Sequence, residues 1–175
     1  QELLVAMKAA YPRWNGNYWS LETINKLINK FPKGQIVIKA DGVVVGCALS
    51  IIVNYNRFGD SHTYRQITGN YIFNTHDPEK GDVLYGIEIF IHPSYRGLRL
   101  GRRLYDARKE LCEQLNLRAI IFGGRIPEYH KYADTLTPKE FIQKVKQKEI
   151  YDPVLFFQLA NDFHVKKVLN NYMPE

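Results

Sequence analysis

The sequence is poor in cysteine and has no long apolar run, and both shortages exclude whole classes of protein. Two cysteines in 175 residues are too few for a disulfide framework or a cysteine-based zinc site. The longest apolar run, Val43 to Val53, is shorter than the roughly 18–20 residues that cross a bilayer. The start of the chain also lacks the pattern of a secretory signal. Cys47 and Cys112 are expected to be buried thiols, which favours a cytoplasmic location.

The composition is that of one ordinary folded domain. Hydrophobic residues make up 45% and charged residues 24%, a balance that excludes disorder, and the length predicts a single domain over residues 1–175. The chain begins with Gln1 and stops after Glu175, so we expect a fragment of a longer protein that ends near an interdomain linker. The net charge of +6 permits a phosphate-bearing partner.

Apolar spacing and turn residues predict alternating helices and strands. Helices are expected near residues 3–10, 21–31, 100–115, 138–148 and 153–159, and strands at 35–40, 43–53, 83–91, 119–122 and 164–169. Asp41-Gly42 suits a two-residue hairpin turn and Asn15-Gly16 a second turn. The long connection 54–82 is expected to hold a short strand near 66–73. This order predicts an α/β (α+β) fold.

The passage from the strand at 83–91 into the helix at 100–115 carries the chemistry. A turn that contains Gly97 and Gly101 leaves backbone N–H groups without internal partners, and the start of the helix adds partial positive charge. We therefore expect an anion site for a phosphate or pyrophosphate, reinforced by Arg96, Arg99 and Arg102. It is neither a Walker loop nor a dinucleotide fingerprint. The alternative is a capped turn whose arginines only meet solvent.

This segment resembles the signature of the GNAT N-acetyltransferase superfamily, Arg/Gln-x-x-Gly-x-Gly/Ala after the fourth strand. Arg96 matches the first position and Gly101 the last, while Arg99 stands at the middle glycine. The resemblance runs from about residue 21 to 169 and implies a GNAT-type acyl-CoA N-acyltransferase fold. That fold has a mixed, mostly antiparallel sheet flanked by helices. Its final strand is expected to be missing here, which would leave one edge of the strand at 164–169 unpaired.

A narrower resemblance concerns residues 82–96, 123–127 and 152–155. They look similar to the acetyltransferase half of bacterial proteins that continue into a carbon–nitrogen hydrolase (nitrilase-like) domain. This implies a fused hydrolase domain after this chain as a covalent partner. The other expected partner is a small-molecule or peptide amine, with neither nucleic acid nor a membrane involved.

The resemblance also implies where the co-substrate acetyl-CoA would bind. Its pyrophosphate would meet the N–H groups of the turn, and its pantetheine arm would lie along the strand at 83–91 like an added strand. A bulge in that strand would point an N–H at the thioester oxygen. The expected cofactor-binding residues are Ile89, Ile91, Arg96, Gly97, Leu98, Arg99, Leu100, Gly101 and Arg102.

The implied reaction is direct transfer of the acetyl group from the thioester to the amine in a ternary complex. Glu88, a carboxylate within the strand at 83–91, is the expected base, although it lies one position from the commonest place for it, and Tyr85 is the alternative. The late-helix tyrosine that the family uses as acid is replaced by Gln158, which leaves Tyr151, Tyr129 or water. The rival function is a catalytically weak acyl-CoA-binding module that regulates the fused hydrolase.

Five residues are candidates for contacts with the acceptor: Tyr71, His76, Arg125, Glu128 and Tyr129. The segment 62–77 would be a lid or acceptor-binding loop, and the alternative is an ordinary packed loop. Residues 125–130 follow a short strand at its C-terminal end, where ligands of α/β folds bind. His62 and His76 have no third ligand at suitable spacing, so no metal site is expected.

Overall fold

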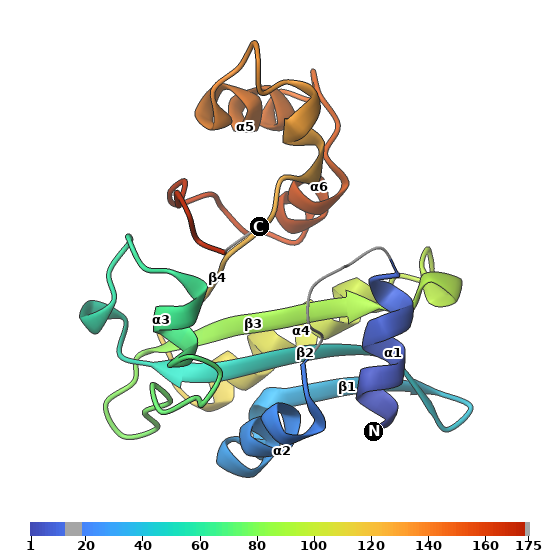
Figure 1. Ribbon diagram of the computed structural model, residues 1–175, viewed down its shortest axis with the longest axis vertical. Helices are drawn as coiled ribbons and strands as arrows, with labels where there is room; N and C mark the ends of the chain where they lie inside the picture. Colours follow the sequence, from blue (N-terminus) through green and yellow to red (C-terminus); the bar gives the residue numbers. More distant parts are fainter. Residues whose placement is uncertain (13–18, 174–175) are drawn as a thin grey trace. The chain divides into compact units, whose positions relative to one another are not determined.

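Four strands form a single mixed sheet in which they lie in chain order, β1 (Gln35–Ala40), β2 (Val43–Val53), β3 (Val83–Ile91) and β4 (Ala119–Phe122) (Figure 1). The first three strands pair antiparallel, whereas β4 pairs parallel to β3. β2 is buried from Val44 to Val53, because strands flank it on both sides and helices cover it. The predicted mixed, mostly antiparallel sheet is confirmed.

The structure is a computed structural model that describes residues 1–12 and 19–173. These residues divide into a first unit built on Gln1–Phe122 and a second unit, Gly123–Tyr172. The turn expected at Asn15-Gly16 lies outside the described residues. The boundaries of one domain over 1–175 stay a prediction.

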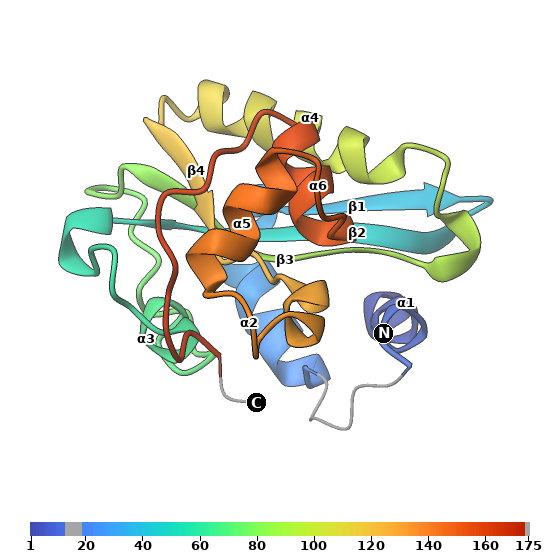
Figure 2. The same ribbon diagram turned by 90° about the horizontal axis from the view of Figure 1, so that it is seen from above.

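The helices of the first unit cover both faces of the sheet. α4 (Leu100–Gln114) lies along one face, and α1 (Glu2–Ala10), α2 (Leu21–Lys30) and α3 (Tyr64–Thr68) lie on the other side (Figure 2). The Ser20 side chain accepts the N–H of Thr23 and so caps the start of α2. Ile24 and Leu27 of α2 are buried, whereas Leu21 and Ile28 are 46% and 40% exposed. Short 3₁₀ turns span Pro32–Gly34, Tyr55–Arg57 and Pro93–Tyr95.

The prediction of a strand near residues 66–73 is wrong, because the helix α3 runs to Thr68 and turns follow it. Thr63 and Gln66 form a reciprocal capping box at its start, and Gly69 ends it with a left-handed φ of 57°. Asn70 and Tyr71 continue in the left-handed region, which a β-strand cannot contain. The capping pair Thr-x-x-Gln was the available sequence signal.

The second unit is helical. It contains a 3₁₀ turn at Pro127–Lys131, then α5 (Pro138–Lys146) and α6 (Pro153–Ala160), which Thr137 and Asp152 cap with their side chains. The strand expected at 164–169 is wrong, since these residues have no regular structure. Val165 and Val168 instead pack on the helical cluster around Phe141. The unpaired strand edge expected there is therefore not present.

Both cysteines are buried, as predicted. Burial raises the pKa of the Cys47 thiol well above its usual range, so this thiol stays protonated and unreactive. No helix among the described residues is both long and apolar enough to cross a bilayer.

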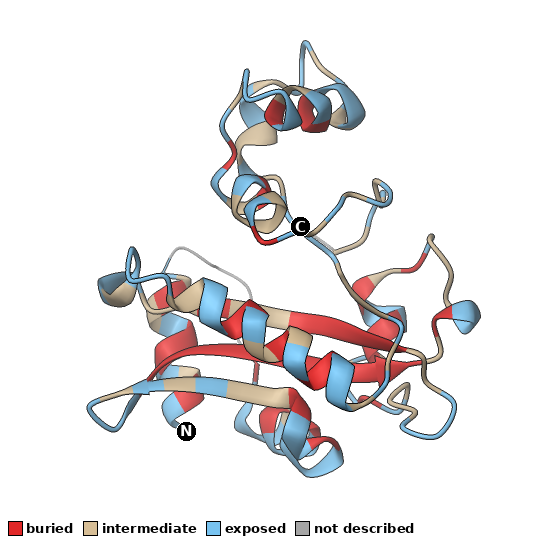
Figure 3. Cartoon of the chain, turned by 180° about the vertical axis from the view of Figure 1, so that it is seen from behind, coloured by how far each residue is buried: buried red, intermediate tan, exposed pale blue. Residues whose placement is uncertain are grey.

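Arg108 of α4 is a fully buried cation, 1% exposed. It is one of the buried residues of α4, whose buried positions face the sheet and whose exposed positions face away from it (Figure 3). Its Nε donates to the Ser50 hydroxyl at 3.1 Å, and its Nη2 donates to the carbonyl oxygens of Leu49 and Glu88, each at 2.6 Å. A Cβ at Gly86 would lie 2.9 Å from its Nη1, so glycine makes room for the guanidinium.

These acceptors stand at a β-bulge. Leu49 pairs with Glu88 and Ser50 with Gly86, which leaves Ile87 as one extra residue in β3. A bulge interrupts the ladder and leaves backbone groups to be satisfied by other donors. Arg108 supplies these donors from one side, and the hydroxyl of Tyr64 donates to the carbonyl of Ile87 at 3.1 Å.

We expect Arg108→Met to lower the free energy of unfolding by about 2–4 kcal/mol, because it leaves buried acceptors without donors. Urea denaturation measures the loss. Arg103→Met removes an exposed charge from the same helix and should change stability by less than about 0.5 kcal/mol. Equal stability of the two variants would contradict a structural role for the buried guanidinium.

Candidate active site

The site is built on the edge of β3 beyond its contact with β4. β4 pairs with β3 only from Val83 to Gly86. Among the described residues, no strand pairs with the same edge of β3 from Ile87 to Ile91. β4 therefore leaves this part of β3 uncovered, and a strand edge of this kind is a place where a further strand can add.

The bulge expected in this strand is confirmed, and it orients Ile89. The N–H of Ile89 donates to Oε1 of Glu88 at 3.0 Å, and its carbonyl accepts from the hydroxyl of Tyr11 at 3.4 Å. Residues of an antiparallel strand turn their backbone groups to alternate edges. Both groups of Ile89 therefore face the open edge and not β2.

Glu88 is half-buried at this edge, and Tyr11 holds its carboxylate. The Tyr11 hydroxyl donates to Oε1 of Glu88 at 2.7 Å, and the Tyr11 ring meets Phe90 edge-on, with centroids 6.0 Å apart. Tyr11 directly follows α1 and lies 77 residues from Glu88. Sequence reasoning missed it, since the only local signal was that a tyrosine and a proline end the first helix.

Tyr85, the alternative base, lies in the interior. Its hydroxyl oxygen is 2.7 Å from Nε2 of His62, whose Nδ1 is 2.8 Å from the carbonyl of Gly59. A carbonyl only accepts, so Nδ1 carries the hydrogen and Nε2 accepts from Tyr85 in the neutral ring. Both side chains are buried, and this hydrogen bond engages the tyrosine with a packed imidazole.

The turn before α4 presents a row of backbone donors. Gly97 and Arg99 have φ values of 83° and 58°, and α4 begins at Leu100. Arg99 thus adopts the left-handed backbone of the glycine that the signature prefers at its position. The N–H groups from Leu98 to Arg102 have no acceptor within the described chain. Such a row of donors at a helix start fits a pyrophosphate.

Of the three arginines expected to reinforce the anion site, one binds backbone carbonyls and two are exposed. Arg96 donates from Nε to the carbonyl of Ile91 at 3.4 Å and from Nη2 to that of Ala10 at 3.3 Å. It therefore ties the end of α1 to the end of β3. Arg99 and Arg102 are exposed and are the better candidates for contact with a phosphate.

Two acceptor candidates of the first unit are packed in the connection between β2 and β3. The Tyr71 ring contacts Trp19 and Tyr64, with centroids 6.3 and 5.7 Å away. His76 accepts the N–H of Ile52 on Nδ1 at 3.0 Å and stacks on Phe31. Burial lowers the pKa of His76, which agrees with a neutral ring that accepts from the backbone.

The other candidates lie in the second unit. Glu128 pairs with Lys131 and donates its own N–H to Asp152, the cap of α6. Tyr151 is 65% exposed and lies against Phe156. Arg125 is exposed. The roles expected of Arg125, Glu128 and Tyr151 stay predictions.

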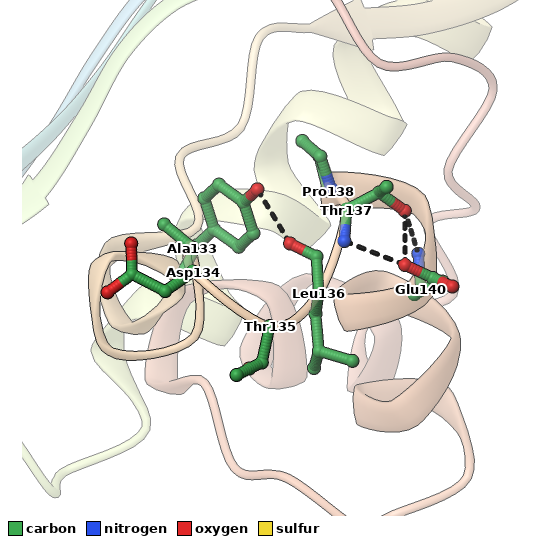
Figure 4. A pocket seen from close by; sticks show the side chains of 8 residues that line it. Ala133, Asp134, Thr135, Leu136, Thr137, Pro138 and Glu140 are labelled. Atoms are coloured by element: carbon green, nitrogen blue, oxygen red, sulfur yellow. Dashed lines mark hydrogen bonds between the residues drawn. The ribbon is translucent and has the colours of Figure 1, made fainter.

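Tyr129 borders an open hollow of about 340 Å³ in the second unit. Its hydroxyl donates to the carbonyl of Leu136 at 2.9 Å, and Thr137 and Glu140 bond to each other in the cap of α5 (Figure 4). These polar groups satisfy each other and do not converge on a ligand. In the described ranges no cluster of three His, Cys, Asp or Glu side chains is placed to hold a metal ion.

Comparisons with known sequences agree with this geometry. The model of the acetyltransferase (GNAT) family matches residues 3–131. "Probable hydrolase YhcX" of Bacillus subtilis is 42% identical over 157 residues, which are 90% of this chain and 30% of that protein. "Uncharacterized N-acetyltransferase YkwB" of the same bacterium is 31% identical over 157 residues, 90% of this chain and 69% of that protein. The chain thus spans less than a third of the first relative.

Solved structures share the fold. The loading GNATL domain of CurA from Lyngbya majuscula superimposes with a TM-score of 0.79 at 22% identity, over 99% of this chain and 83% of that one. The GphF GNAT-like decarboxylase in complex with isobutyryl-CoA gives a TM-score of 0.73 at 19% identity, over 99% and 88%. At these identities the likeness concerns the fold alone.

The environment of His76 predicts a pH dependence of stability. Its pKa is lower in the folded chain than the ordinary value of about 6.5, so the unfolded chain binds more protons and stability falls as the pH drops below that value. We expect thermal melts to show this loss between about pH 7 and pH 5. His76→Gln, whose amide oxygen still accepts from Ile52, should make the profile flatter. His130→Gln, at an exposed position, should not. An unchanged profile in His76→Gln would contradict this assignment.

Proposed function

The chain belongs to the acetyltransferase (GNAT) family, and from that premise we propose that it is an acetyl-CoA-dependent N-acetyltransferase. The acetyl group would pass directly from the CoA thioester to an amine in a ternary complex. The observation that carries the proposal is the open edge of β3, with Glu88 on it and the row of N–H donors just beyond its end.

The residues present fit an acyl-CoA ligand. The N–H groups from Leu98 to Arg102 suit the pyrophosphate, and the exposed Arg99 and Arg102 add charge for it. Ile89 and Ile91 lie on the open part of β3, where the amides of a pantetheine arm would add to the sheet like a strand. The isobutyryl-CoA bound to a protein of the same fold supports this class of ligand.

Ile89 is the proposed donor to the thioester oxygen. In the free protein its N–H holds Oε1 of Glu88, an anionic oxygen at the open edge. A thioester oxygen in the same place would gain this hydrogen bond as negative charge develops on it. The carboxylate of Glu88 would then release the N–H of Ile89, face the amine and keep its hydrogen bond to Tyr11.

Glu88 is the proposed general base. The amine nitrogen must lose a proton as it bonds to the acetyl carbon and the carbon–sulfur bond breaks, and the Glu88 carboxylate takes this proton directly or through one water. Its negative charge also favours an acceptor that arrives as an ammonium ion. A small-molecule or peptide amine fits this half-buried position.

A second candidate function is supported by the relative named as a probable hydrolase, of which this chain matches 30%. The chain would then be an acyl-CoA-binding module that regulates a hydrolase domain fused after it. The two functions differ in thiol release: a module would bind acetyl-CoA without releasing CoA faster when amines are added. A cytoplasmic location is part of both proposals, on the ground of the two buried thiols.

Acetyl-CoA is expected to raise the melting temperature, because it binds the folded chain. The double variant Arg99→Gly/Arg102→Ala should weaken its affinity about tenfold, or 1.4 kcal/mol, while glycine suits the left-handed backbone at position 99. Lys33→Ala/Lys80→Ala removes the same charge from exposed sites away from the turn and should bind normally. The absence of any shift at millimolar acetyl-CoA would refute the proposed function.

Glu88→Gln is expected to lower kcat about 100-fold at neutral pH, because an amide cannot act as a base. Its melting shift with acetyl-CoA should match that of the wild type, since Gln still accepts from Ile89 and Tyr11. Thiol release with a panel of primary amines measures turnover. Full turnover in a variant of lower stability would show that Glu88 is structural.

A further inference from the structure

The hydroxyl of Tyr11 lies at the open edge of β3, beside the group proposed as the base. It donates to Oε1 of Glu88 at 2.7 Å and is 3.4 Å from the carbonyl oxygen of Ile89. We propose that Tyr11 is a catalytic residue that donates a proton to the departing CoA thiolate and recovers it from Glu88. This inference rests on the proposed function.

The position of Tyr11 is set by contacts on both sides of it. Its backbone N–H donates to the carbonyl of Met7 as the last bond of α1, and Arg96 holds the carbonyl of the preceding Ala10. Its ring meets Phe90 edge-on. A side chain restrained in this way loses little further freedom when it acts, which favours catalysis by orientation.

The site is accessible at this point. Tyr11, Glu88 and Ile89 are each half-buried, so a ligand that lies on the open edge reaches all three. Two other tyrosines near β3 differ, because Tyr64 donates to the Ile87 carbonyl and Tyr85 contacts His62, and both are buried. Among these three tyrosines, Tyr11 is the one that reaches the open edge of β3.

A phenol suits this proton transfer. Thiols and tyrosine have ordinary pKa values of about 8.5 and 10, so a proton passes from the phenol to a thiolate at a small cost when both are held in contact. The phenolate that forms is then adjacent to a carboxyl group that has just been protonated, which is the stronger acid by several pKa units. The return of the proton from Glu88 to Tyr11 is therefore downhill.

The step balances without a further reactant. The amine nitrogen bonds to the acetyl carbon, the carbon–sulfur bond breaks, and its electron pair leaves on sulfur. Glu88 takes the proton from nitrogen, Tyr11 gives its own proton to sulfur, and the Glu88 proton moves to the Tyr11 oxygen along their hydrogen bond. The products are the amide and the CoA thiol, with both side chains restored.

Tyr11→Phe is the test, because it removes the hydroxyl and keeps the ring on Phe90. We expect kcat to fall about 100-fold, with the melting shift for acetyl-CoA unchanged. The alkaline limb of the pH profile of kcat, which reports loss of the acid's proton, should disappear in this variant. Tyr55→Phe is the matched control, since its hydroxyl donates to Asp60 at 3.0 Å, beyond the far end of β2, and it should keep both kcat and this limb.

The double variant Tyr11→Phe/Glu88→Gln separates a shared proton path from two independent effects. Residues that act as one unit give non-additive losses, so its kcat should lie within about threefold of the slower single variant. If the double variant loses kcat by the product of the two single losses, or if Tyr11→Phe has a normal kcat, the inference is overturned while the proposed function stands. A wild-type chain that binds acetyl-CoA but releases no thiol with any amine would overturn the proposed function and this inference together. A melting curve of each variant shows that it is folded.

Discussion

The buried guanidinium of Arg108 is the interaction on which the site depends, because it stabilises an interruption in the middle of the sheet. An extra residue in β3 breaks the ladder with β2, and Arg108 donates to the carbonyl oxygens of Leu49 and Glu88 on the two strands. An arginine with these neutral partners bears a desolvation cost. That cost is offset by satisfying acceptors that would otherwise be buried without donors. The absence of a side chain at Gly86 provides the space.

The β-bulge in β3 determines which backbone groups face the open edge of this strand. Up to Gly86 the strand β3 is paired on both sides, and beyond it β4 has ended. The altered register turns the N–H and carbonyl of Ile89 to the unpaired edge, where Glu88 and Tyr11 now meet them. The same short stretch therefore combines a strand edge that β4 does not cover, an N–H donor and a carboxylate, which are the elements that an acyl transfer to an amine requires.

Two distant segments complete this edge. The end of α1 brings Tyr11 to Glu88, and Arg96 fastens the two together through the carbonyls of Ala10 and Ile91. The left-handed conformation of Arg99 carries an energetic penalty that glycine would not. Arg99 therefore keeps the backbone conformation of the glycine that the family signature prefers, and its side chain adds a positive charge beside the row of N–H donors.

The sequence by itself determined most of the local structure, since the Asp41-Gly42 hairpin and the caps at Ser20, Thr137 and Asp152 depend on residues a few positions apart. It also indicated the family and the anion turn, because both are contiguous patterns. Its expectation of a last strand at 164–169 failed, since Val165 and Val168 pack on the helical cluster around Phe141 and not in a sheet. The roles of Arg108 and Tyr11 were decided only by the tertiary structure. Each acts on a strand far away in the chain, and a buried arginine has the same local signature as a solvated one.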